Sequence, residues 1–452
     1  MNDPSLLARI QFALTVGFHF IFPPITIGLA WLLVIVEGLG WKRDDQTWVR
    51  IGKFFSKILA LTFAVGTATG IVMEFQFGTN WAEYSKFVGD IFGAPLAAEG
   101  VFAFFLESGF LGLYLFGRSR VSKGVHWFSC LMVAVGATIS AFWILVANSW
   151  QQTPAGFIIQ NGRAELTSFW QAVFNPSTLP RVLHTVDAAL IAGAFIMAGV
   201  SAYLILNNKE TEAAKRAMTL AVTFGLIVSL LEVFPFGHIS GQQVARTQPE
   251  KFAAIQGLYT TQQGAPIALF AYPTTPPPKL KARVEFPYLL SVLAFGDPHA
   301  TIKGLNEFPP DQVPPLWVTF VSYHNMVLLG MYFILLMLVG FVQIRRGKLW
   351  QSRGLLKLFA WSMPLPLIAC QFGWSAAEVG RQPWVVYHVM RTADAVSKTV
   401  AREAILFSLF LFGAIYLLLG ALYLFLFLRE MKHGPEPEGP KSASINPKEV
   451  FA

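Results

Sequence analysis

The chain has 452 residues, of which 54% are apolar or aromatic and only 13% are charged. An ordinary soluble domain has about 25% charged residues, so this composition excludes a typical soluble globular protein. The net charge of +8 does not indicate nucleic-acid binding, because Lys and Arg gather in short segments between apolar runs and form no basic stripe interleaved with aromatic residues. We therefore expect a membrane protein with no nucleic-acid partner.

Apolar runs with almost no charge recur along the chain, and their length of about 20 residues suits the hydrocarbon core of a bilayer. In chain order we expect spans at residues 10–36, 54–77, 94–116, 125–147, 183–206, 218–239, 317–344, 355–374 and 404–428. The first run is too long for a signal-peptide core and follows no basic leader, so we expect it to be retained. The sequence predicts an all-α integral membrane protein, a bundle of about nine transmembrane helices.

The connections between these runs alternate in charge. Basic residues concentrate in residues 42–53, 118–123, 209–216, 345–357 and 429–432. The other connections are longer and less basic. Because basic loops stay in the cytoplasm, this alternation predicts the N-terminus outside and the C-terminus in the cytoplasm.

We expect one membrane-embedded unit across residues 1–452, with two segments outside the spans. Residues 241–315 form a long external loop, and its Pro-rich stretch from Pro273 to Pro278 cannot be regular helix. Residues 433–452 have the composition of a disordered cytoplasmic tail. Cys130 and Cys370 lie in apolar runs and provide no disulfide framework, zinc spacing or Cys-x-x-Cys-His motif. Other residues must therefore hold any cofactor.

Ionisable residues inside apolar spans are costly, so each is a candidate functional residue. They are His19, Glu74, Glu99, Glu107, His184, Asp187, Glu232, His238, His324 and Glu378. Translating position along each span into depth places several of them in the outer half of the membrane. The members of this group are His19, Glu99, His184 and Glu378, together with Met326. Residues from five different spans therefore share one depth.

Haem iron is the chemistry that best fits this group. Imidazole, thioether and sometimes carboxylate serve as axial ligands, and apolar walls solvate the macrocycle. Each residue alone is weak evidence for haem. A histidine in a span can instead form a hydrogen bond between helices, and a methionine can simply pack in the core. Glu99 and Glu107 lie about 12 Å apart along one helix. They suit either successive stations of a proton path or a structural ion pair.

At these residues the sequence resembles the haem-bearing large subunit of the cytochrome bd quinol oxidases, from Leu7 to Leu428. The matching stretches are Arg9–Gly28, Met73–Trp81, Gly89–Ser108, Trp143–Pro154, Leu183–Ala188 and Gly373–Trp384, the last reading GWSAAEVGRQPW. The resemblance implies that His184 and Met326 are the axial ligands of a low-spin haem b. It also implies that His19 and Glu378 are axial ligands at a two-haem centre, which holds a high-spin haem b and haem d or a third haem b.

The resemblance implies roles for five further residues. Glu99 matches a carboxylate at the two-haem centre, and Glu107 matches one on the inward proton route. Trp374 and Arg381 match residues beside the haems. Lys251 matches the basic residue of a quinol-binding loop, which here is of the short type.

Two positions depart from the family pattern. Gln256 stands where the quinol loop usually has a Glu, so the proton acceptor for quinol is in doubt. His324 stands where some members have Arg, which bears only on haem potential.

The resemblance implies a terminal quinol:oxygen oxidoreductase. It would oxidise membrane quinol at the outer face, reduce O2 to water at the two-haem site and generate a proton gradient without pumping. The implied location is a prokaryotic cell (inner) membrane. The implied partners are a second large membrane subunit, with or without small single-span subunits. Two alternatives stay open. One is a haemless proton-coupled membrane transporter. The other is a haem-binding family member without oxidase activity, because Gln256 replaces the usual Glu of the quinol loop.

Overall fold

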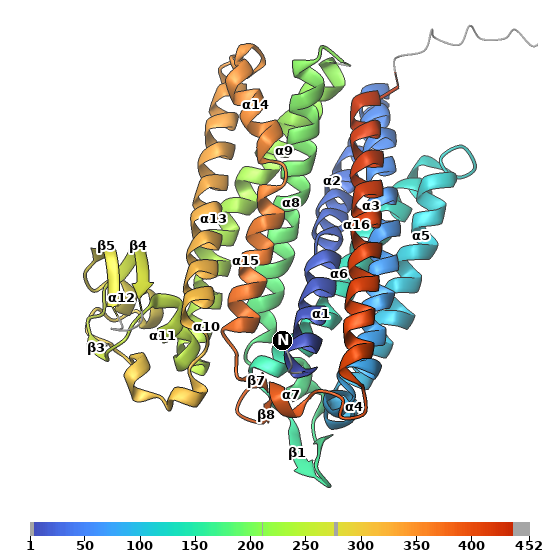
Figure 1. Ribbon diagram of the computed structural model, residues 1–452. Helices are drawn as coiled ribbons and strands as arrows, with labels where there is room; N and C mark the ends of the chain where they lie inside the picture. The colour runs from blue at the N-terminus through green and yellow to red at the C-terminus, as the bar shows by residue number, and fades with distance from the viewer. Residues whose placement is uncertain (1–3, 210, 275–278, 437–452) are drawn as a thin grey trace, which may run out of the picture.

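The computed structural model describes residues 4–209, 211–274 and 279–436. Within these residues, nine helical segments are long and apolar enough to cross a membrane, and they form one bundle (Figure 1). The predicted class and number of spans are therefore confirmed. Most of the predicted tail, residues 437–452, and residues 275–278 of the Pro-rich stretch lie outside the described residues.

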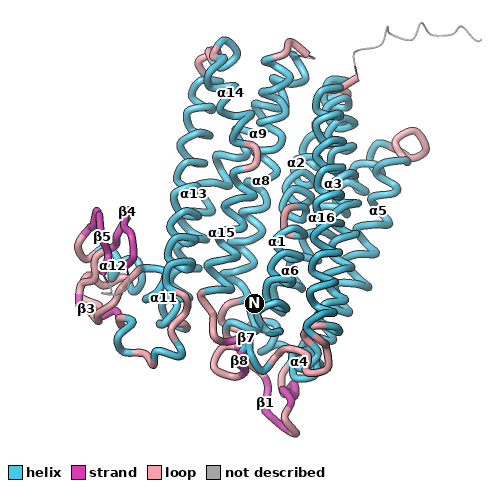
Figure 2. The backbone as a smooth tube through the Cα atoms, in the orientation of Figure 1, coloured by secondary structure: helices cyan, strands magenta, loops and turns pink. Residues whose placement is uncertain are grey.

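The spans are built from the following helices, of which η1 and η2 are π-helices: α1 (Pro4–His19), α2 (Phe22–Arg43), α3 (Gln46–Thr79), α4 (Ala82–Ala98), η1 (Glu99–Phe104), α5 (Phe105–Phe116), α6 (Lys123–Gln152), α8 (Thr178–Leu206), α9 (Thr211–Leu231), η2 (Glu232–Gly237), α10 (His238–Thr247), α13 (Leu316–Arg345), α14 (Arg353–Ser362), α15 (Leu365–Val379) and α16 (Arg402–His433). Shorter elements connect them: β1 (Phe157–Gln160), β2 (Arg163–Leu166), α7 (Phe169–Val173), α11 (Pro249–Gln256), β3 (Gln262–Gln263), β4 (Ile267–Thr274), β5 (Lys279–Phe286), α12 (Leu289–Phe295), β6 (Thr301–Ile302), η3 (Leu305–Glu307), η4 (Pro310–Gln312), η5 (Leu349–Gln351), β7 (Trp384–Val386), β8 (Met390–Arg391) and η6 (Thr392–Asp394). Figure 2 shows that the strands lie below or beside the bundle.

Small residues allow α2 and α8 to pack closely. A Cβ added at Gly193 would overlap the backbone of Gly28, and a Cβ added at Gly28 would overlap the backbone of Gly193. Contacts between small residues are the usual way in which membrane helices approach, because lipid offers no hydrophobic drive between them. From Ala192 to Ala202 every residue of α8 is buried. This part of α8 is the dry centre of the bundle.

Four spans are interrupted, whereas continuous helices were expected. The first breaks between His19 and Phe22, just before two prolines that occupy the first turn of α2. Proline has no N–H to donate to the preceding turn, so a helix ends or kinks there. The third and sixth spans contain π-helices, which begin at Glu99 and Glu232. The eighth breaks around Pro364. Interruptions of this kind often mark functional sites.

The third span begins earlier than expected, at Ala82 instead of residue 94. Its first turns contain Glu83, Lys86 and Asp90, which hid this stretch from a search for uncharged runs. Glu99 consequently lies near the middle of this helical segment, at the first residue of η1. The sixth span likewise continues to Thr247, into the first residues of the expected external loop.

The segment between the sixth and seventh spans is folded. The strands β4 and β5 pair antiparallel with Ile267 opposite Phe286, and α12 and α11 pack nearby (Figure 1). The ring of His324 on α13 lies between two carbonyl oxygens, 2.9 Å from Phe320 O and 3.0 Å from Ala268 O. The second of these contacts ties β4 to the bundle.

The two ends of the described chain lie at opposite ends of the bundle, as an odd number of spans requires (Figure 1). The basic connections that follow α2, α5, α8 and α13 all lie at the end where α16 finishes (Figure 1). This arrangement agrees with the charge alternation in the sequence. The direction of the bundle in the membrane stays a prediction.

Candidate active site

A cavity of about 1700 Å³ runs through the bundle. Ligand pockets in proteins commonly measure about 300–1,000 Å³, so this cavity has room for more than one ligand of ordinary size. Every site residue predicted from the sequence lines it: His19, Glu99, Glu107, His184, Lys251, Gln256, Met326, Trp374, Glu378 and Arg381. The fold thus brings together residues separated by more than 300 positions in the sequence.

His19 is held in the form that suits a metal ligand. Its Nδ1 lies 3.0 Å from the hydroxyl of Thr69, and that hydroxyl donates its hydrogen to the carbonyl oxygens of Val65 and Gly66. Because a hydroxyl has one hydrogen, Nδ1 must be the donor to Thr69, and Nε2 keeps a free lone pair. A Cβ at Gly70 would lie 3.1 Å from the His19 ring, so this glycine makes room for it.

His184 has a carboxylate beside it. Its Nδ1 lies 3.0 Å from Glu232 Oε1, at the first residue of η2. Asp187, almost one turn further along α8, lies close to Glu232. His184 Nδ1 and Glu232 Oε1 lie within ion-pair distance, although Nδ1 makes no well-directed hydrogen bond to the carboxylate, and a carboxylate on this side of the ring is the usual neighbour of a metal-ligating histidine. Asp187 and Glu232 are both buried.

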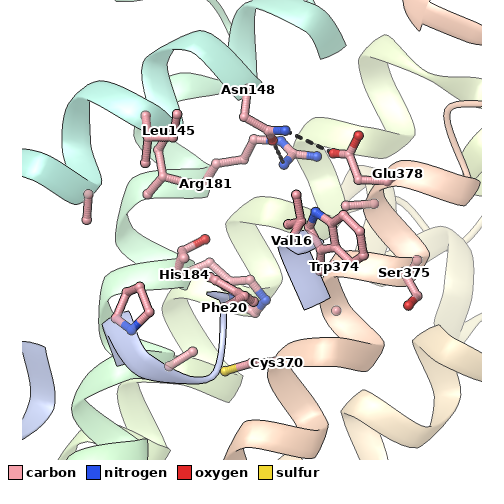
Figure 3. A pocket seen from close by; sticks show the side chains of 18 of the residues that line it. Val16, Phe20, Leu145, Asn148, Arg181, His184, Cys370, Trp374, Ser375 and Glu378 are labelled. Carbon is pink, nitrogen blue, oxygen red and sulfur yellow. Dashed lines mark hydrogen bonds between the residues drawn. The ribbon is translucent and has the colours of Figure 1, made fainter. Parts of the chain in front are cut away.

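Met326 approaches α15 at a glycine. A Cβ at Gly373 would lie 2.9 Å from the Met326 sulfur, so no larger residue would fit there without a shift. Trp374, the next residue, lines the cavity, and Figure 3 shows its ring between Glu378 and His184. The thioether therefore has a fixed position at the wall of the cavity.

Glu378 accepts hydrogen bonds on both carboxylate oxygens. Asn148 donates to its Oε1 at 3.0 Å, Gln152 donates to the same oxygen at 3.3 Å, and Arg381 donates to Oε2 at 2.5 Å. Arg181 donates to Asn148 Oδ1 at 2.8 Å and so extends the network (Figure 3). A carboxylate has about four lone-pair sites, so one acceptor site of Glu378 is still free.

Positive charge exceeds negative charge around Glu378. Arg181 and Arg381 line the cavity close to this one carboxylate. Buried charges are costly unless they are paired, so this wall favours further anionic groups in the cavity. The two propionate carboxylates of a haem are groups of this kind. Together with His19, the charge balance indicates that the residues fit haem.

Lys251 is buried on α11. Its ammonium group donates to Gln152 Oε1 at 2.9 Å, Ala377 O at 2.9 Å and Gln248 Oε1 at 3.4 Å. Burial, reinforced by the charge of Arg181, holds the pKa of Lys251 well below its ordinary value. The three donated bonds occupy all the hydrogens of an ammonium group, so a substrate oxygen would have to replace one of them.

Gln256 lies at the end of α11 and is buried, and its Oε1 has no hydrogen-bond partner. An unpaired buried acceptor is uncommon and costs about 1–3 kcal/mol. A hydroxyl group in the cavity would satisfy it.

Glu99 and Glu107 both face the cavity from the third span. Ser140 on α6 donates to Glu99 Oε1 at 2.9 Å. A Cβ at Gly136 would lie 3.0 Å from the backbone nitrogen of Glu107, so α6 approaches this residue closely because it has a glycine there. Glu107 is buried.

Sequence reasoning missed several residues of the site. Asn148 and Gln152 lie in a stretch that carries the family resemblance, but no role was inferred for them. Arg181 lies before the expected start of its span and was not considered. Glu232 was identified as an ionisable residue within a span, but its contact with His184 was not predicted. Gly70 and Gly373, which make room for His19 and Met326, could not be identified, because the contact depends on which helix faces meet.

Comparisons with known proteins identify the family of the chain. The family model for cytochrome bd terminal oxidase subunit I matches residues 7–435. The cytochrome bd ubiquinol oxidase subunit 1 of Bacillus subtilis is 41% identical over 98% of this chain and 96% of its own length. The cytochrome bd-II ubiquinol oxidase subunit 1 of Escherichia coli is 34% identical over 96% of this chain and 98% of its own length.

A solved structure is also similar. The bd oxidase of Geobacillus thermodenitrificans superimposes with a TM-score of 0.90 at 30% identity, covering 96% of this chain and 100% of the matched chain. The chain therefore belongs to the cytochrome bd terminal oxidase subunit I family, as a multi-pass membrane subunit of a quinol oxidase.

Proposed function

We propose that this chain oxidises membrane quinol near the external loop and passes the electrons through haems in its cavity to a site where O2 becomes water. The observation that carries the proposal is the shared cavity, which is lined by two histidines, a methionine thioether and a carboxylate suited to axial ligation.

His184 and Met326 would hold a low-spin haem b, and His19 and Glu378 would hold the two-haem centre, with a high-spin haem b and either haem d or a third haem b. The bound haems would supply electron transfer and, at the second centre, O2 activation. Thr69 and Glu232 orient the two imidazoles. Arg181 and Arg381 supply positive charge for propionates.

Protons are handled by residues on two sides of the cavity. Gln256 orients a quinol hydroxyl through its unpaired Oε1, and Lys251 binds the quinol oxygen by exchanging one of its present acceptors. The quinol protons leave at the outer face. Glu107 and Glu99 pass protons inward from the cytoplasmic side toward the two-haem centre. Taking protons from one side and releasing them on the other separates charge without a pump.

The subunit would act with a second large membrane subunit, with or without small single-span subunits, in a prokaryotic cell membrane with its N-terminus outside. Exposed apolar side chains cover α16 over much of its length, and this surface suits lipid or a partner helix.

The purified complex tests the proposal. A pyridine-haemochrome assay and a reduced-minus-oxidised spectrum should give three haems, and quinol addition should drive O2 consumption. A colourless protein would indicate the haemless transporter instead. Bound haem without quinol-dependent O2 consumption would indicate the inactive haem-binding alternative.

A further inference from the structure

The helix α11 carries two buried charged side chains in succession, Glu250 and Lys251. Consecutive residues of an α-helix point about 100° apart around its axis. The two charged groups therefore reach different neighbours. Lys251 lines the cavity, whereas Glu250 does not.

Glu250 is held by the turn that joins β7 to β8. The hydroxyl of Tyr387 donates to Glu250 Oε2, and His388 Nε2 lies 3.3 Å from Glu250 Oε1. Burial and the contact with Glu250 raise the pKa of Tyr387, so its hydroxyl keeps the hydrogen that it donates. The backbone of His388 is left-handed, with a φ of 55°, and this uncommon conformation persists where surrounding contacts hold it. We refer to Glu250, Tyr387 and His388 as the latch.

Lys251 points past the end of α15. A Cβ at Gly380 would lie 3.1 Å from Lys251 Cγ and 3.2 Å from its Cε, so the stem of the lysine passes close to the backbone there. A rotation of α11 about its axis would push this stem toward Gly380 or pull the ammonium group away from Gln152. The contacts of Lys251 therefore depend on the rotation of α11.

The helix α6 supports both sides of this arrangement. Gln151 O accepts from Tyr387 N at 2.9 Å and holds the turn, and the next residue, Gln152, accepts from Lys251 through its side chain at 2.9 Å. The contacts form a closed ring from α6 through the turn to α11 and back to α6. Apolar contacts are non-directional, whereas hydrogen bonds prefer particular directions. Glu250 therefore fixes the rotation of α11 more sharply than its apolar neighbours do.

His388 is the cationic partner of Glu250. Among the residues that the structure describes, no Lys or Arg lies within ion-pair distance of this carboxylate. Arg391 on β8 is paired with Asp311 at 2.5 Å, and Lys251 is directed to the other side of α11. The side chain of His388 is about half exposed, so solvent weakens its pair with Glu250. An imidazole gains or loses its charge near neutral pH.

We propose that Glu250 is a positioning residue of the quinol site: the latch sets the rotation of α11 and thereby directs the Lys251 ammonium group into the cavity. The inference rests on the proposed quinol oxidase function, in which Lys251 binds a quinol oxygen. Neither Glu250 nor His388 lines the cavity, so the latch acts through Lys251. It keeps the lysine in one orientation while a quinol oxygen replaces one of its three acceptors.

Steady-state kinetics of the purified complex test the positioning. Glu250→Gln keeps an acceptor for Tyr387 and loses the charge that attracts His388. The KM for quinol should rise about twofold to fivefold, the effect of one half-exposed ion pair, and kcat should be unchanged. Glu307→Gln, at an exposed glutamate between the sixth and seventh spans, is the matched control and should leave KM unaltered.

His388→Gln separates positioning from a general loss of structure. In the wild type, KM should rise as the pH increases through the range in which imidazole loses its charge, because the ion pair is present only below that range. The KM of His388→Gln should not show this rise. Combining it with Glu250→Gln should add nothing to Glu250→Gln alone, because both changes break the same pair. His299→Gln, at an exposed histidine between the same two spans, should keep the wild-type pH dependence.

Hydrogen exchange monitors the latch without turnover. Amides 252–256 of α11 should exchange faster in Glu250→Gln and His388→Gln than in the wild type or in Glu307→Gln. Unchanged exchange in both latch variants would overturn the inference, and so would faster exchange at an unchanged KM. A fall in kcat at constant KM would also overturn it, because that pattern indicates proton transfer instead of positioning.

The proposed function can fail separately. A wild type that binds haem but shows no quinol-dependent O2 consumption would defeat that function. The exchange result would then decide alone whether the latch holds α11.

Discussion

The helix α8 joins two regions of opposite character. From Ala192 to Ala202 it is buried against α2 and α9, and its closest contact is Gly193 against Gly28. From Arg181 to Ala189 the same helix lines the cavity. One region is dry and tightly packed, and the other is open and ionisable.

The difference between these two parts of α8 explains how a membrane bundle can contain a large cavity. The glycine contact fixes α2 against α8 at one level, while the first, third and sixth spans are interrupted at residues that line the cavity. Proline and π-helical turns change helix direction without leaving the membrane, because neighbouring groups can satisfy the freed backbone atoms. The packed region therefore provides the rigidity on which the geometry of the ligands depends.

The largest expected effect comes from the packed region. Gly193→Ala places a methyl group on the backbone of Gly28, so the loss of stability should exceed the roughly 1–3 kcal/mol of ordinary overpacking. Little assembled complex should survive size-exclusion chromatography in detergent. Gly109→Ala, at a membrane glycine with open space around it, is the control. Normal assembly of Gly193→Ala would mean that the contact is not essential.

In the cavity, Met326→Leu should remove the low-spin haem b spectrum and leave the two-haem centre occupied. Leucine keeps the bulk of the side chain but has no sulfur to coordinate iron. A reduced-minus-oxidised spectrum measures the change, and Met331→Leu, an exposed methionine on the same helix, is the control. An unaltered low-spin band would disprove the role of Met326.

Glu107→Gln should bind all haems and reduce O2 about 10²-fold more slowly or worse, because an amide cannot relay protons. Turnover is measured with an oxygen electrode, and haem content is measured on the same sample. A rate within about twofold of the wild type would show that protons reach O2 by another route.

Glu232→Gln should alter the low-spin haem without removing its ligand. Loss of the carboxylate at His184 Nδ1 makes the imidazole a weaker electron donor, so the midpoint potential should rise and haem affinity should fall by about 10–100-fold. Redox titration and haem retention measure both. Asp187→Asn, which touches Glu232 but not His184 Nδ1, should have the smaller effect. An unchanged potential in Glu232→Gln would mean that this contact does not tune the haem.

The smallest effect is expected at Gln256. Gln256→Ala should weaken quinol binding by the roughly 0.5–1.5 kcal/mol of one neutral hydrogen bond. Gln256→Glu should add an ionisation to the pH–rate profile, since a carboxylate can accept a quinol proton. Steady-state activity against pH measures both variants. Loss of nearly all turnover in Gln256→Ala, with haems retained, would show that this side chain does more than orient quinol.

The sequence by itself determined the class of the protein, its number of spans and a set of cavity residues. The reason is that a bilayer core demands long uncharged runs, so each ionisable residue within one is conspicuous. His19, His184 and Glu378 could therefore be chosen before any fold was known. The resemblance to a family supplied their individual roles.

Only the tertiary structure decided the partners of these residues. The spacing of His184 and Glu232 says nothing about their 3.0 Å contact, and Thr69 has no local signal that marks it as the support of His19. The π-helical turns at Glu99 and Glu232 were also invisible, because a π-helical turn and a straight helix share the same apolar composition. Which helix faces meet depends on packing over the whole bundle. The hydropathy of a span indicates its depth in the membrane but not its rotation about the helix axis.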